Sequence, residues 1–321
     1  METMIVFCHI EKTAGTALTE LLRAHFGLRH VDVLRHAITS RDGVVAPNFY
    51  DAEDLLKDRR LYPRMRSLAG HHIRPCVDFG EFDGDMHWYT FLRDPIARLR
   101  SHYLHEVAIK NYSGSFPEYL DKFPRDDIMV RKLAGERDLA AAKSILSTRM
   151  RFVGIQERFD QSLLLMRDAL GLGDFSVSYA KRRNTAVSRV GGPIYRLRGR
   201  LTKRSENSEI AMQERAKSSL EQHHGLLVEA NSLDQQLYEY ACNEIWSQQV
   251  DQYGGTERLA ADTQVDMSKA PNSSYRTTLS FVYRNLVYKP YVAADVRRNQ
   301  RLGVQKTTNT RQWKESKRNH D

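Results

Sequence analysis

The first half of the chain repeats a short apolar run, a polar turn and a stretch of helical apolar spacing. Residues 4–8 are apolar and rich in β-branched side chains, which predicts a buried strand. Residues 17–26 carry leucine and phenylalanine at helical spacing, and Gly27 follows where a helix can end. Residues 88–92 and 152–155 predict further buried strands, each leading into a helix. This alternation favours an α/β fold, a parallel sheet flanked by helices.

The segments between these elements are more polar. Residues 29–66 read as a polar connection that contains a short helix over residues 51–58. Residues 67–73 read as a strand end or a loop. Residues 208–249 have a helical pattern. We therefore expect a helical C-terminal region after the sheet.

The last part of the chain differs from the rest in charge. Residues 271–321 hold 11 Lys/Arg and 3 Asp/Glu, although the net charge of the whole chain is only +9. We expect a domain over residues 1–255 and a basic, partly disordered extension over residues 256–321. Within the extension, one predicted helical face ends at Pro290 and is expected to dock on the domain or rest on an anionic membrane surface. Its apolar residues are Leu279, Val282, Tyr283, Leu286 and Val287.

Composition narrows the compartment and the partners. A basic balance favours acidic partners such as nucleotides, acidic glycans, nucleic acid or membrane lipid. The three cysteines, Cys8, Cys76 and Cys242, are scattered without disulfide or zinc spacing, which fits a reducing compartment. No secretory signal or membrane span is visible. These features predict a soluble cytoplasmic enzyme, with peripheral membrane contact through its basic tail as a further expectation.

The loop after the first strand reads Glu-Lys-Thr-Ala-Gly-Thr-Ala over residues 11–17. A loop between a strand and a helix start points backbone N–H groups into one concavity, which suits a phosphate or sulfate. Lys12 adds a charge, and Thr13 and Thr16 add hydroxyl donors. The ATP-type loop is excluded, because its lysine follows the glycines whereas Lys12 precedes Gly15. The alternative interpretation is an ordinary turn with a surface lysine.

A second basic motif follows the strand at residues 88–92. It begins Arg93-Asp94-Pro95, and the proline stands where a helix can start. Ser101 lies about two turns into that helix. An arginine fork and a serine hydroxyl suit a phosphate monoester. The alternative is Arg93 paired with a carboxylate at the helix start.

Together with the block Val-Gly-Ile-Gln-Glu-Arg-Phe-Asp at residues 153–160, these motifs resemble the sulfotransferases that use 3′-phosphoadenosine-5′-phosphosulfate (PAPS). The carbohydrate branch, including the heparan sulfate 2-O type, is the most similar. The resemblance covers residues 4–255 and departs at Glu11, where many members carry proline. It implies a P-loop-like sulfotransferase fold, PAPS as donor, adenosine 3′,5′-bisphosphate as product, and no metal. The donor-binding residues it implies are Lys12, Thr13, Ala14, Gly15, Thr16, Ala17, Arg93 and Ser101.

The resemblance also implies a catalytic base. In related enzymes a Gly-His pair between the two donor motifs supplies it, and Gly70-His71 stands in that place. His72 follows directly, so either histidine can fill the role, beside Lys12 as the third catalytic residue. For His71 the structural alternative is a hydrogen bond in a packed turn, which is the interpretation preferred for the other candidates. Those are His9, His87 and His102.

The predicted reaction is transfer of the sulfuryl group from PAPS to a hydroxyl of a carbohydrate or glycoconjugate. Both neutral and anionic acceptors are compatible with this prediction. The alternatives are an ATP-dependent phosphoryl transferase and a non-enzymatic binder of acidic glycan or nucleic acid. The missing Gly-Lys-Ser/Thr loop weighs against the first. Residues 181–205 hold nine Lys/Arg and few aromatics, so they favour a lid or solvated loop over a nucleic-acid site.

Overall fold

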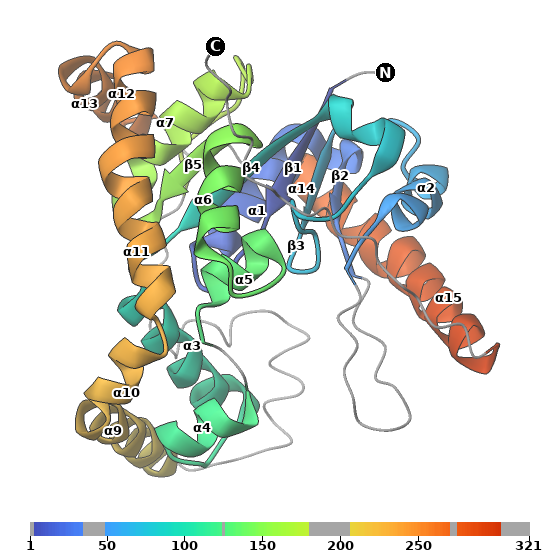
Figure 1. Cartoon of the computed structure of the whole chain (residues 1–321). Helices are drawn as coiled ribbons and strands as arrows, with labels where there is room; N and C mark the ends of the chain where they lie inside the picture. Colours follow the sequence, from blue (N-terminus) through green and yellow to red (C-terminus); the bar gives the residue numbers. More distant parts are fainter. Residues whose placement is uncertain (1–2, 35–48, 124–125, 180–205, 270–274, 303–321) are drawn as a thin grey trace, which may run out of the picture. The chain divides into compact units, whose positions relative to one another are not determined.

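The computed structural model describes residues 3–34, 49–123, 126–179, 206–269 and 275–302. Its centre is a five-stranded sheet in the order β2-β3-β1-β4-β5 (Figure 1). Every pairing within the sheet is parallel. The strands are β1 (Met4–Cys8), β2 (His30–Asp32), β3 (Ser67–Gly70), β4 (Met86–Leu92) and β5 (Met150–Ile155). The predicted α/β class is therefore confirmed.

The central strand β1 is buried along its whole length, as an apolar run in a parallel sheet should be. It pairs with β3 on one side and β4 on the other, so the loops that leave β1, β3 and β4 meet at the same edge. On β5, a Cβ at Gly154 would lie 2.5 Å from the Phe91 ring. Glycine at that position lets β4 and β5 pack closely.

Two compact units divide the chain, and each is described by itself. The first holds residues 1–94, 128–179 and 233–321, and the second holds residues 95–127 and 180–232. The chain thus leaves the sheet unit after Asp94 and returns to it twice. The domain boundary expected at residue 255 stays a prediction.

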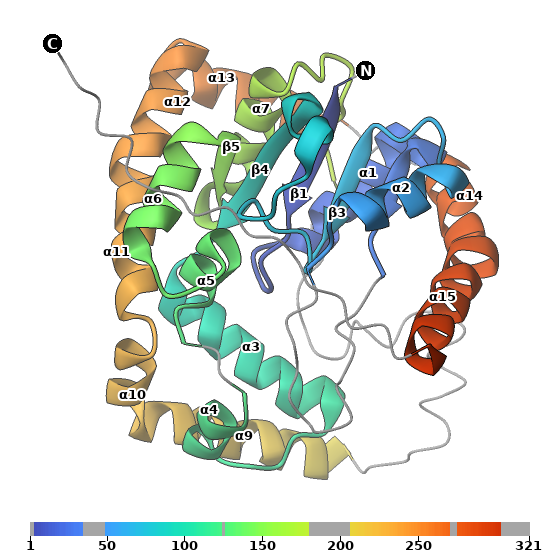
Figure 2. The same cartoon turned by 45° about the vertical axis from the view of Figure 1, so that its right-hand side comes forward.

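Helices cover both faces of the sheet in the first unit. Helix α1 lies on one face and helices α2, α5 and α6 lie on the other (Figure 2), which right-handed crossovers between parallel strands require. The helices of this unit up to α12 are α1 (Gly15–Phe26), α2 (Ala52–Leu61), α5 (Ile128–Ala134), α6 (Leu139–Thr148), α7 (Phe159–Ala169), α11 (Ser232–Tyr240) and α12 (Trp246–Tyr253). Short 3-10 and π turns join them: η1 (Gly27–Arg29), η2 (Gly80–Asp85), η3 (Gln156–Arg158) and η5 (Ala241–Ile245).

The C-terminal helices belong to the sheet unit. Helix α13 (Thr256–Met267) packs on α7, and helix α14 (Tyr275–Tyr283) packs on α1. The π turn η6 (Arg284–Tyr288) then leads into α15 (Lys289–Arg301). Within η6, Tyr288 is fully buried and donates a hydrogen bond of 2.8 Å to Asp58 of α2. This part of the extension is therefore fastened to the fold by side chains far apart in the sequence.

The prediction that Pro290 ends the helix is wrong, because α15 continues through it. The wide turn just before it gives the physical reason. The N–H of Lys289 bonds to the carbonyl of Arg284, five residues back, so the helix is locally widened where the proline ring and its missing N–H would disturb a regular turn.

The predicted apolar helical face covers the core only in part. Tyr283 packs against the core, whereas Leu279, Val282 and Leu286 are 47%, 44% and 73% exposed. The packed side of the same helix instead uses Ser280 and Tyr288. Among the described helices, none combines the length and the apolar run that crossing a bilayer requires.

The second unit is helical and has a core of its own. Its helices are α3 (Pro95–Lys110), α4 (Phe116–Lys122), α9 (Glu206–Gln222) and α10 (His224–Glu229). Pro95 opens α3, as predicted. Leu99 and Tyr103 of α3 meet Phe116 of α4 in this core. A capping box between Ser115 and Glu118 begins α4.

Candidate active site

The loop between β1 and α1 has an unusual backbone. Lys12 and Ala14 both adopt the left-handed region, with φ of 70° and 62°. A residue other than glycine in this region costs roughly 1–2 kcal/mol of conformational free energy. Backbone strain of this kind is common at ligand sites. Ala14 caps α1 without a side-chain hydrogen bond, while its carbonyl accepts from the N–H of Ala17 at 3.1 Å. The first N–H groups of the helix, from Gly15 and Thr16, therefore face out of the helix start.

Gly15 is required here because a ring packs against it. A Cβ at Gly15 would lie 1.7 Å from Nε2 of His9. The His9 ring also stacks on Phe7 of β1, with 5.0 Å between centroids. Burial, and then the charge of His71, hold the pKa of His9 well below its usual range. His9 is thus a neutral packing residue, in line with the structural interpretation preferred for it.

Arg93 joins the two donor motifs. It follows β4, and its Nη1 donates a hydrogen bond of 3.0 Å to the carbonyl of Lys12. Burial lowers its pKa from the usual value, although Glu157 and Asp94 oppose the shift. Its Nε is enclosed and finds no hydrogen-bond acceptor among the described residues. A buried donor at this edge of the sheet suits an anion next to the loop.

The third block of the sequence holds the Arg93 segment in place. Glu157 accepts a hydrogen bond of 3.1 Å from the N–H of Asp94 and another of 2.9 Å from the hydroxyl of Tyr238. Its carboxylate thereby ties the end of β4 to η3 and α11. The block therefore contributes to the site by positioning Arg93, because Glu157 holds the neighbouring residue Asp94.

His71 stands directly after β3, and its ring is fixed by the backbone. Its Nδ1 lies 3.0 Å from the carbonyl of His9, which can only accept, so Nδ1 carries the proton. In the neutral ring Nε2 is then the proton acceptor. The His71 ring is 43% exposed and packs on His9 with centroids 4.0 Å apart. This is the tautomer that a general base needs.

Lys132 is a buried cation that contacts the backbone of this histidine. It belongs to α5, its side chain is 5% exposed, and its Nζ donates to Glu11 at 2.9 Å and to the carbonyl of His71 at 2.6 Å. Burial lowers the pKa of Lys132, and the Glu11 carboxylate opposes that shift. The Glu11 carboxylate in turn lies 3.8 Å from Nδ1 of His71. Glu11, which departs from the resembled family, is thus part of a buried pair beside the candidate base.

A pocket of about 240 Å³ opens beside these residues. Its lining includes His71, Gly15 and Thr16. It also includes a charged side formed by Arg23, Asp32 and Arg284, which come from α1, β2 and η6. His72 is not among its lining residues; its carbonyl accepts a hydrogen bond of 3.0 Å from the N–H of Tyr50.

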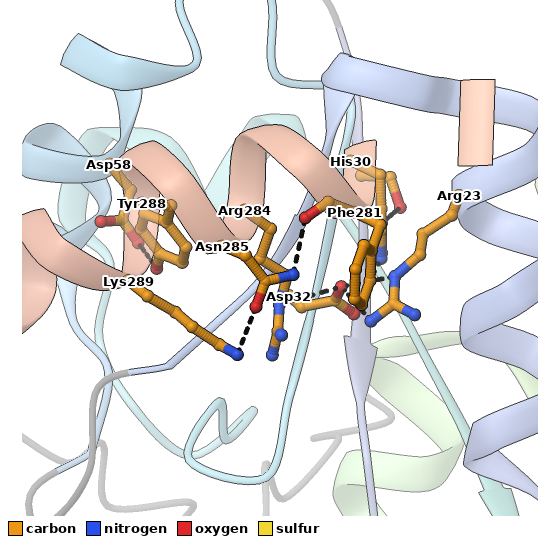
Figure 3. A network of polar contacts seen from close by, with 10 residues as sticks. Arg23, His30, Asp32, Asp58, Phe281, Arg284, Asn285, Tyr288 and Lys289 are labelled. Atoms are coloured by element: carbon orange, nitrogen blue, oxygen red, sulfur yellow. Dashed lines mark hydrogen bonds and ion pairs between the residues drawn. The ribbon is translucent and has the colours of Figure 1, made fainter. Parts of the chain in front are cut away.

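Asp32 is the centre of the charged side of the pocket (Figure 3). Arg23 donates to its Oδ2 through Nε at 2.8 Å and Nη2 at 2.5 Å, and His30 meets Oδ1 at 3.2 Å. The Nε of Arg284 lies 3.5 Å from Oδ2. Burial alone would raise the pKa of Asp32, but His30 and Arg23 outweigh it and hold the pKa below its usual range. Asp32 is therefore ionised.

The residues predicted to bind the donor nucleotide are not all placed in the same way. Lys12, Gly15, Thr16 and Arg93 gather in the sheet unit at the edge where β1 and β4 end. The hydroxyl of Thr13 donates to the carbonyl of Ile10 at 2.8 Å, so that hydroxyl is used within the loop.

Ser101 belongs to the other unit, as the seventh residue of α3. The basic segment 181–205, expected as a lid or solvated loop, lies outside the described residues.

No protein-family model matches the chain, and no curated protein is significantly similar to it. The functional argument therefore rests on the local geometry. Sequence reasoning missed Lys132, Arg23 and Arg284 as members of the site. A lysine within an apolar helical run was the available signal for Lys132; the two arginines sit in ordinary amphipathic patterns and gave none.

Proposed function

We propose that the chain is a PAPS-dependent sulfotransferase that transfers a sulfuryl group to a hydroxyl of a carbohydrate or glycoconjugate. The observation that carries the proposal is the hydrogen bond from Arg93 to the carbonyl of Lys12. It joins two motifs that resemble the 5′-phosphosulfate loop and the 3′-phosphate site of this family, at the shared edge of adjacent parallel strands. The sulfotransferase-type fold is part of the same proposal.

The donor would lie across the start of α1. Lys12 and the N–H groups of Thr13 to Thr16 would face the 5′-phosphosulfate, and Arg93 would hold the 3′-phosphate. Thr13 would act through its N–H, since its hydroxyl is bonded to Ile10. The enclosed Nε of Arg93 would gain an acceptor on donor binding.

Transfer would follow an in-line path. Nε2 of His71 takes the proton of the acceptor hydroxyl as its oxygen attacks sulfur. The bond between sulfur and the bridging oxygen of the donor breaks, and its electron pair stays on the 5′-phosphate of adenosine 3′,5′-bisphosphate. Lys12 stabilises the charge that develops there. His71 is favoured over His72 because its ring lines the pocket and has its tautomer fixed by His9.

The test is a transfer assay with sulfur-labelled PAPS and a mixture of glycan acceptors. Wild type should label at least one glycan, and Lys12→Ala should nearly abolish labelling. The lysine is half-buried at the loop, so circular dichroism should show a folded variant. Normal labelling by folded Lys12→Ala would remove the leaving-group role of Lys12, and wild type without any donor turnover would contradict the proposal.

A further inference from the structure

The charged side of the pocket holds more positive than negative charge. Arg23 and Arg284 both face the single Asp32 carboxylate. Its Oδ2 already accepts from Arg23, and its Oδ1 meets His30, so little of its bonding capacity remains for Arg284. The Nε of Arg284 is enclosed and has no hydrogen-bond acceptor among the described residues. An arginine held in this way still has donors to offer a ligand.

A third cation stands close by on the same helix. Lys289 donates to the neutral amide oxygen of Asn285 at 2.5 Å. Burial, followed by the charges of Arg284 and Arg23, lowers the pKa of Lys289. In Figure 3 the ends of Arg284 and Lys289 lie near each other in the view, and Arg23 ends on the other side of Asp32. Within the described part of the chain, Asp32 is the carboxylate whose charge acts on Arg284, so the positive charge of the cluster exceeds the negative.

We propose that Arg23, Arg284 and Lys289 form a subsite for an acidic group, a carboxylate or a sulfate monoester, on the acceptor itself. That the bound molecule is the sulfate acceptor rests on the proposed function. The subsite for an acidic group follows from the cluster alone. Arg284, Arg23 and His71 line the same pocket of about 240 Å³. A molecule whose hydroxyl meets His71 in this pocket would have the two guanidinium groups within the same space for an acidic substituent.

Two of the three cations come from outside the segment that carries the family resemblance. Arg284 and Lys289 lie beyond residue 255, in η6 and α15. Arg284 lines the pocket, and Tyr288 fastens its turn to Asp58 of α2 at 2.8 Å. The competing explanation is that Arg284 is only a strut that ties the C-terminal helix to β2 through Asp32.

The experiment measures binding of three hexasaccharides by calorimetry. Hyaluronan carries carboxylates without sulfate, keratan sulfate carries sulfate without carboxylate, and carboxyl-reduced hyaluronan carries neither. Wild type should bind at least one acidic probe about tenfold or more tightly than the neutral one, the gain expected from a charge-assisted contact. Which acidic probe binds distinguishes the two sources of the charge.

Arg284→Ala and Lys289→Ala should reduce acidic-probe binding toward the level of the neutral probe. Arg298→Ala removes the same charge from an exposed position of α15 and should leave binding unchanged. Lys289 is exposed, so its variant should fold even if the Arg284 variant does not.

Equal binding of all three probes by wild type, or no binding of either acidic probe, would overturn the subsite. So would a loss in Arg298→Ala as large as in Lys289→Ala, which would indicate general attraction to a basic surface. The probes are measured with and without adenosine 3′,5′-bisphosphate. A chain that selects the acidic probe but does not bind the nucleotide keeps the subsite and loses the proposed function; the reverse result keeps the function and loses the subsite.

Discussion

The pair formed by Glu11 and Lys132 offers a quantitative test of how the candidate base is held. Lys132→Met removes a cation that is 5% exposed and leaves the Glu11 carboxylate, 20% exposed, without the donor 2.9 Å away. Removing one partner of a buried pair costs roughly 3–5 kcal/mol. Because Glu11 keeps some contact with water, we expect the lower end of that range. The carbonyl of His71 also loses its donor at 2.6 Å.

Urea unfolding, monitored by tryptophan fluorescence, measures the loss of stability in the unit that contains the sheet. Trp88 and Trp246 are both buried in the unit that contains the sheet. The free energy of unfolding of that unit should fall by about 3 kcal/mol in Lys132→Met. The double variant with Glu11→Gln should recover part of the loss, because neither buried charge then remains without its partner.

The matched control is Lys57→Met. Lys57 meets Glu53 at 2.8 Å and, at the longer distance of 3.7 Å, Asp295. Glu53 is 66% exposed, so that pair should contribute less than about 1 kcal/mol and the total loss should stay below that of Lys132→Met. A Lys132→Met variant no less stable than Lys57→Met would refute the reasoning. A double variant that is less stable than Lys132→Met alone would also refute it, since it would show that the pair is not the source of the loss.

Three further outcomes are expected. His71→Ala should lower sulfate transfer by about 10²–10⁴-fold with nucleotide affinity unchanged, while His72→Ala should be milder; a larger loss in the latter would move the base by one residue. Burial lowers the pKa of His9 below its unfolded value of 6.5, so the stability that its neutral ring supports should be lost as pH falls below that value. Urea midpoints between about pH 7 and pH 5 should therefore drop less in His9→Phe than in wild type; equal slopes would assign the acid sensitivity elsewhere. Truncation after Gly255 should destabilise the sheet unit, because it removes the buried Tyr288, and an unchanged midpoint would show that the C-terminal helices are dispensable.

Local patterns were enough to predict the sheet class and the loops that end β1 and β4. Apolar runs of parallel strands and the proline at the start of α3 are local signals. Strand β2 was missed because it is only three residues long, His30–Asp32, and carries two polar side chains. Ser67, the partner of His30, is 37 residues away, and Arg23, the partner of Asp32, lies on the preceding helix, so only the fold reveals why these polar groups are buried.

The outward apolar face of α14 was misread for a related reason. Periodicity finds an apolar side of a helix but does not say which side packs. Here polar contacts fix which side packs: Arg276 donates to the carbonyl of His25 at 2.9 Å, and Tyr283, a member of the predicted face, donates to the carbonyl of Leu61 at 2.9 Å. The role of Arg284 in the pocket follows from the same anchoring, so it too depends on tertiary contacts.

The central claim is that the site binds a nucleotide with a 3′-phosphate. Calorimetry with adenosine 3′,5′-bisphosphate and with adenosine 5′-monophosphate tests it most directly. The account predicts at least about tenfold tighter binding of the bisphosphate, from one charge-assisted contact of roughly 1.5–3 kcal/mol, and a loss of that preference in Arg93→Ala. Equal affinity of the wild-type chain for the two nucleotides would contradict it.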